Sequence, residues 1–157
     1  MTHLPINRIV LFTGLMLGLL LVLAACGEEE DPNALRVPME VVEGCSDVRT
    51  ETCKQSGHAL LTPTDGQVSV FIKVGRAATA NEPQPLYIYS GRCASLGDKA
   101  ITLEGVIFGE SRNTLDTTLA SLTDGNHAIA LHRTGLALRA TAQGEAPVIV
   151  CGDIPAQ

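Results

Sequence analysis

The chain has 157 residues, with 11 Lys and Arg against 17 Asp and Glu, and a formal charge of −6. This length fits one domain, and the 45% hydrophobic content excludes a wholly disordered chain. The acidic balance argues against a nucleic-acid partner, because such binding depends on Lys and Arg at phosphates. The absence of Trp and the low aromatic content of 3% also exclude a base-stacking surface.

The first 25 residues are typical of an export signal. Arg8 is the only charged side chain among them, and residues 9–25 form an apolar run that ends in two alanines. A positive start, an apolar centre and small residues at the end predict a secretory signal peptide over residues 1–25. A transmembrane anchor is the alternative, since the run is close to the lower length limit for a span. In both cases the rest of the chain is exported.

The end of the apolar run, Leu23-Ala24-Ala25-Cys26, resembles the lipobox of bacterial lipoproteins. The resemblance implies cleavage before Cys26 and attachment of lipid, including palmitate, to Cys26, so that the membrane is a partner. Residues 26–35 begin with an acidic run, and its repelling charges predict an extended tether. Gly27 is not the aspartate that retains many lipoproteins in an inner membrane. We therefore expect an exported protein that is lipid-anchored to a bacterial membrane, the outer membrane if the cell is diderm, in the periplasm or at the cell surface.

Four cysteines remain beside Cys26. They are Cys45, Cys53, Cys93 and Cys151. An exported compartment permits disulfides, and four cysteines allow three pairings. We favour Cys45–Cys53, which closes a short loop, together with Cys93–Cys151. A zinc site is not favoured, because no Cys-x-x-Cys spacing occurs.

Residues 36–157 are predicted to form one all-β domain, because period-2 alternation recurs and no convincing amphipathic helix appears. The expected strands are residues 68–74, 86–89, 101–106, 114–119, 127–133, 137–141 and 148–151. About seven or eight short strands indicate a β-sandwich or barrel. Residues 82–85 are expected to be a stiff connector, because they contain two prolines. A short helical turn is expected at residues 119–122.

Glycines and polar residues predict the turns between these strands. The turn signals lie at residues 64–66, 90–91, 96–98, 108–110, 123–126, 134–135 and 143–145. Asp153 follows Cys151-Gly152 and is expected to cap a turn.

Three segments resemble copper/zinc superoxide dismutase-like domains, over about residues 60–155. Tyr87-Ile88-Tyr89-Ser90-Gly91-Arg92-Cys93 is similar to the His-x-His-x-Gly-x-Cys segment, residues 128–132 to the later strand that ends in a copper-binding His, and residues 150–154 to the Ala-Cys-Gly-Val-Ile strand. The resemblance implies a Greek-key β-barrel or sandwich and selects the Cys93–Cys151 disulfide.

The copper ligands of the resemblance are mostly absent. Tyr87 and Tyr89 stand where the family has His, and phenols are poor copper(II) ligands at neutral pH. Only seven residues separate Cys93 from Ile101 and none is a His, so the zinc loop is missing. Of the copper ligands, His132 alone remains. Alternation places Tyr87, Tyr89 and His132 on the outward face, where they form either a remnant surface site or a decayed site with packed tyrosines and a hydrogen-bonded His132.

The expected function is a lipid-anchored, non-catalytic cell-envelope protein, a binding or structural module without a cofactor that has an envelope protein or a small ligand as its partner. The alternative is a copper- or zinc-binding protein, or a residual dismutase-type enzyme, which would need His132 together with His58 or His127. Protein recognition through the tyrosine face is a third possibility, because Tyr is frequent at interfaces. The lack of a G-x-S-x-G elbow gives no support to a serine hydrolase.

Overall fold

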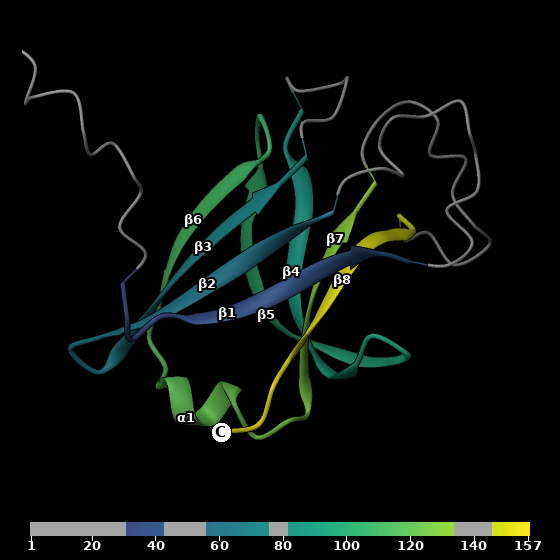
Figure 1. Cartoon of the computed structure of the whole chain (residues 1–157). Coiled ribbons are helices and arrows are strands. Elements are labelled where there is room, and N and C mark those ends of the chain that lie inside the picture. Colours follow the sequence, from purple (N-terminus) through teal and green to yellow (C-terminus); the bar gives the residue numbers. More distant parts are fainter. Residues whose placement is uncertain (1–30, 43–55, 76–81, 134–145) are drawn as a thin grey trace, which may run out of the picture. The chain divides into compact units, whose positions relative to one another are not determined.

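This computed structural model describes residues 31–42, 56–75, 82–133 and 146–157. These residues contain eight β-strands and one short helix (Figure 1). All pairings between strands are antiparallel. The elements are β1 (Leu35–Val41), β2 (Gly57–Thr64), β3 (Gln67–Val74), β4 (Gln84–Arg92), β5 (Ser95–Val106), β6 (Glu110–Leu115), α1 (Leu119–Leu122), β7 (His127–His132) and β8 (Val148–Ile154). The all-β prediction is therefore confirmed.

The strands form one nearly closed, barrel-like sheet. Their order is β5-β4-β7-β8-β1-β2-β3-β6, so the first strand lies beside the last. The sheet curls until its two edge strands, β5 and β6, approach each other (Figure 1). A tight hairpin at Phe108 and Gly109 joins these strands, and the Ile107–Glu110 bridge pairs them at this end.

Side chains join β5 to β6 where the backbone ladder is missing. The backbone N–H of Glu104 donates to Asn113 Oδ1 at 2.7 Å, and the Glu104 carbonyl accepts from Ser111 Oγ at 2.7 Å. Asn113 Nδ2 in turn donates to Ser111 Oγ at 3.0 Å. These bonds satisfy both backbone groups of Glu104, which would otherwise remain on an open sheet edge.

The inside of the barrel is the main core, and period-2 alternation supplies it. In β3, for example, the side chains of Val68, Val70 and Ile72 are buried while their neighbours in sequence are not. Ile129 and Leu131 of β7 enter the same core. Burial of such aliphatic side chains contributes about 1.5–3 kcal/mol each, which makes this core the principal source of stability.

The turn chemistry is confirmed at two hairpins. Asp65 and Gly66 both have positive φ, 46° and 84°, and join β2 to β3. This pair of left-handed residues matches the twist of a two-residue hairpin, and Asp and Gly adopt it readily. Phe108 and Gly109 have φ of 54° and 87° at the β5–β6 hairpin. A left-handed backbone is unusual for a bulky Phe.

Several predicted boundaries are wrong, and prolines or glycines explain most of them. β1 and β2 were not predicted, and each contains a proline, Pro38 or Pro63, which removes one backbone donor from its strand. β4 begins at Gln84, within the expected connector, and a register shift between Gln84 and Leu86 accommodates Pro85. Gly91 and Gly97 lie inside β4 and β5, and the turn falls at Cys93 and Ala94 instead.

Other expectations have mixed outcomes. The strand expected at 114–119 ends at Leu115, whereas the helical turn at 119–122 is confirmed as α1. The tether was expected to be extended to residue 35, but Ala34 N–H donates to Asp31 O in a turn and β1 begins at Leu35. The strand at 137–141, the signal peptide, Cys26, Cys45 and Cys53 lie outside the described residues. None of the helices in the described ranges is long and apolar enough to cross a membrane.

Candidate functional site

Tyr87, Tyr89 and His132 meet on the outer face of two neighbouring strands. Tyr87 and Tyr89 belong to β4, His132 ends β7, and these strands pair with Tyr87 opposite Ala130 and Tyr89 opposite Ala128. Their neighbours in sequence face the main core. The small alanines opposite them leave room for the aromatic rings to lie across β7.

All three side chains lie on the outer face of their strands, as expected. The prediction that they form an exposed surface site is wrong for Tyr89 and His132. Only 5% of Tyr89 and 4% of His132 is exposed. Tyr89, Ala128, Ala130 and Cys151 form a second, smaller buried cluster, against which Val42, Tyr87, Cys93, Leu96 and Val148 pack. A thin hydrophobic layer therefore covers this part of the barrel wall.

Hydrogen bonds fix the tautomer of His132. Its Nδ1 lies 2.6 Å from the carbonyl oxygen of Ala146, and its Nε2 lies 2.8 Å from the Tyr89 hydroxyl. A carbonyl can only accept, so Nδ1 carries a proton and donates it. In the neutral ring Nε2 is then an acceptor, and the Tyr89 O–H donates to it. Both ring nitrogens are thus engaged by protein groups.

Tyr87 forms the half-buried border of this site. Its ring makes an edge contact with Tyr89, at a centroid distance of 6.0 Å, and with His132, at 5.3 Å. Lys99 of β5 places its ammonium 4.2 Å from the centre of the Tyr87 ring. This cation–π contact is partly exposed and is worth about 0.5–1 kcal/mol.

The residues of this site do not fit a copper or zinc ion. A metal would need the Nε2 lone pair of His132, which already accepts from Tyr89. Within the described ranges, no group of three or more His, Cys, Asp and Glu side chains could hold a metal.

The other two candidate histidines do not join His132. His127 begins β7, five positions from His132, so it lies about 17 Å away along the strand and on the opposite face. Its Nδ1 lies 2.9 Å from Asp124 Oδ1. His58 lies within β2, which β1 and β8 separate from β7.

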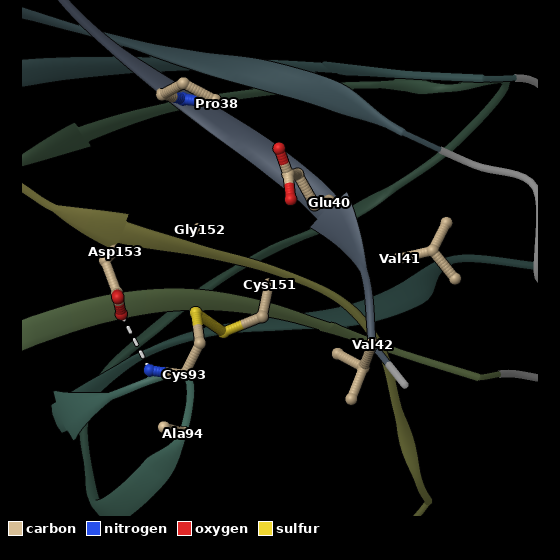
Figure 2. Close-up of a pocket in the computed structure, with 9 residues that line it drawn as sticks. All are labelled: Pro38, Glu40, Val41, Val42, Cys93, Ala94, Cys151, Gly152 and Asp153. Carbon is tan, nitrogen blue, oxygen red and sulfur yellow. Dashed lines mark hydrogen bonds between the residues drawn. A yellow bond between two sulfur atoms is a disulfide. The ribbon is translucent and has the colours of Figure 1, made fainter. Parts of the chain in front are cut away.

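The predicted Cys93–Cys151 disulfide is confirmed, and it lies in the floor of a groove. The two Cα atoms are 5.8 Å apart. Figure 2 shows that the bond links Cys93, in the β4–β5 turn, to Cys151 of β8, near the end of β1. The groove has a volume of about 510 Å³, and Glu40, Val41, Val42 and Ala94 line it around the disulfide.

Asp153 caps the β4–β5 turn, as expected from its place after Cys151. Its Oδ1 accepts from the Cys93 N–H at 2.7 Å (Figure 2), and its Oδ2 accepts from Arg92 Nη2 at 3.0 Å. Neither the Arg92–Asp153 ion pair nor the groove was predicted from the sequence. The disulfide was the signal that could have revealed the pair, because Arg92 precedes one cysteine and Asp153 closely follows the other.

No protein-family model, curated protein or solved structure matches this chain.

Proposed function

We propose that the protein is a lipid-anchored, non-catalytic module of the bacterial cell envelope, built on a superoxide dismutase-like Greek-key barrel that has lost its metal site. The lipobox-like segment ending at Cys26 supports export and anchoring. A disulfide between Cys93 and Cys151 supports an oxidising compartment.

The strand order supports the Greek-key assignment. β4, β5 and β6 follow one another around the barrel, while β7 lies beside β4 and β3 lies beside β6. Three consecutive strands flanked by one that returns from a long connection define this motif. The disulfide ties the end of β4 to β8, which agrees with the cysteine pairing that the resemblance implies.

The proposal that the metal site has been lost rests on the hydrogen bonds of His132. Its Nδ1–H is held by the Ala146 carbonyl and its Nε2 by the Tyr89 hydroxyl. In the family that the sequence resembles, the corresponding His binds copper and the position of Tyr89 is a second His. Here one former ligand position supplies a hydrogen bond to the other, so the pair stabilises the barrel wall.

A binding role then falls to the groove over the disulfide, since the tyrosine face is largely covered. Concave surfaces with an apolar lining and a few polar groups are the usual sites for small ligands and peptide side chains. Val41, Val42 and Ala94 supply the apolar part, and Glu40 supplies a carboxylate. This arrangement favours a ligand that is apolar with a donor or positive group.

Calorimetric titration of the full-length protein in detergent with Cu²⁺ and, separately, Zn²⁺ tests the loss of the metal site. We expect no stoichiometric binding at micromolar metal. One-to-one binding that persists in His127→Ala and disappears in His132→Ala would contradict the proposal and favour the metal-binding alternative.

The anchor is tested separately by metabolic labelling with palmitate. Label is expected in the parent chain and not in Cys26→Ala, which should also leave the membrane fraction. Equal labelling of both chains would contradict lipid attachment at Cys26.

A further inference from the structure

The aromatic residues that are most easily oxidised are concentrated at one site. The chain has two Tyr and no Trp, and both tyrosines lie in the site described above, with ring centroids 6.0 Å apart. Phenol and indole are the aromatic side chains that most readily give up one electron. One-electron oxidation of an aromatic side chain in this protein is therefore expected at Tyr87 or Tyr89.

Tyr89 has a base in place to receive its proton. Because the Ala146 carbonyl holds the proton of His132 on Nδ1, the lone pair of Nε2 faces the Tyr89 oxygen at 2.8 Å. A phenol loses an electron far more easily when its proton can leave in the same step. At this distance no rearrangement of the two side chains is required, which is the geometric condition for a general base.

Among the residues that the structure describes, Tyr87 has no base to accept its proton, and a positive charge lies over its ring. Within the described ranges its hydroxyl makes no hydrogen bond, and the Lys99 ammonium lies over its ring at 4.2 Å. A positive charge over the ring face opposes the removal of an electron from it. Its half-buried ring does contact both Tyr89 and His132, so it gives an electron a short route between solvent and the buried pair.

We propose that Tyr89 and His132 form a redox-active pair, in which Tyr89 gives one electron to an external one-electron oxidant such as nitrogen dioxide. In this step the O–H bond of Tyr89 breaks, its proton forms an N–H bond at Nε2 of His132, and the electron reduces nitrogen dioxide to nitrite. The products are a neutral phenoxyl radical at Tyr89 and an imidazolium at His132. A one-electron reductant reverses the step, returning the proton to Tyr89.

Burial gives the radical a protected position. Tyr89 is 5% exposed and lies among Ala128, Ala130 and Cys151, so a second radical has little access to its ring. The pair would remove a one-electron oxidant without the damage that follows when tyrosyl radicals couple at a surface. This function needs no metal and does not depend on the lipid anchor.

The test uses hexachloroiridate(IV), an outer-sphere oxidant that becomes hexachloroiridate(III), with the full-length protein in detergent. Its reduction is followed by stopped-flow absorbance, and the radical is detected by electron paramagnetic resonance after rapid freezing. Tyr89→Phe removes the proposed radical site, and Tyr87→Phe is the matched control from the same strand. His132→Asn removes the base while its amide can still donate to the Ala146 carbonyl.

We expect a tyrosyl signal in the parent and in Tyr87→Phe, and none in Tyr89→Phe. His132→Asn should slow oxidation by at least about a hundredfold, the lower end of what a positioned base contributes to proton transfer. Heavy water should slow the parent more than this variant. A signal that survives in Tyr89→Phe and disappears in Tyr87→Phe would overturn the proposal, as would oxidation of His132→Asn at the parental rate. If His132→Asn does not fold, the two Tyr variants and the solvent isotope effect on the parent still decide the question.

Discussion

The carboxylate of Asp153 accepts a 2.7 Å hydrogen bond from the backbone N–H of Cys93, whose sulfur is bonded to Cys151 on the same strand as Asp153. The β4–β5 turn is thus held to β8 by a covalent bond and by an adjacent carboxylate. Arg92 adds two contacts to the other oxygen of Asp153, at 3.2 and 3.0 Å. This junction fixes one wall of the groove and the position of the turn.

Comparing Asp153→Ala with Arg92→Ala separates the Cys93–Asp153 hydrogen bond from the Arg92–Asp153 ion pair. Asp153→Ala is expected to lower the free energy of unfolding by about 1–2 kcal/mol, because it removes a charged acceptor from a part-buried N–H. Arg92→Ala should cost less than about 1 kcal/mol, since the Arg92–Asp153 pair is largely exposed. Urea unfolding measures both. Equal losses would show that the Cys93 contact adds nothing beyond the ion pair.

Removing the disulfide has a larger effect. Cys93→Ser with Cys151→Ser should lower the free energy of unfolding by up to about 4 kcal/mol, because the bond closes a loop of 58 residues. Cys45→Ser with Cys53→Ser is the comparison, where the shorter loop predicts about 2.5 kcal/mol if these cysteines are paired. Chemical denaturation of both double variants shows which of them loses more free energy of unfolding. A smaller loss for the long loop would contradict this account.

Asn113 closes the seam between the two edge strands. Asn113→Ala should cost about 1 kcal/mol and speed the exchange of the Glu104 amide hydrogen, because that N–H loses its acceptor. Hydrogen exchange followed by mass spectrometry or NMR detects the change. The exposed Asn33 supplies a control, and Asn33→Ala should leave Glu104 exchange at the parental rate. Unchanged exchange in Asn113→Ala would show that the seam is closed by other means.

Asp124 gives the stability a dependence on acid pH. The backbone N–H of Asn126, and next the ring of His127, hold the pKa of Asp124 below its ordinary value of 3.8. A lowered pKa in the folded state stabilises the protein above the unfolded value, and this contribution is lost as pH falls through the folded value. The melting temperature of the parent should therefore approach that of Asp124→Ala between about pH 4 and about pH 2. A constant difference over this range would contradict the linkage.

The all-β class and the face of each site residue could be predicted because they follow from local alternation. The Cys93–Cys151 pairing was favoured among three possible sets, and the family resemblance selected it. The burial of Tyr89 and His132 could not be predicted. Alternation reports which face a side chain occupies, but not whether another layer covers that face. Here residues from three distant segments, Val42, Leu96 and Val148, form part of that cover.

The prolines of β1 and β2 show a second limit. No strand was predicted around Pro38 or Pro63, yet both lie within paired strands. Proline removes one ladder donor, and neighbouring pairs can compensate for that loss when the rest of the strand buries apolar side chains. Val37, Met39, Ala59 and Leu61 do so here.

The pairing of β1 with β8 also affects how the chain is made. Glu40 and Val41 pair with Cys151 and Val150, so the partner of an early strand is synthesised about 110 residues later. Until then, the growing chain exposes the unsatisfied edge of β1 and the apolar side chains beneath it. Such long-range pairing folds slowly and leaves the chain prone to aggregation. Efficient production should therefore depend on a chaperone that shields β1 until β8 emerges.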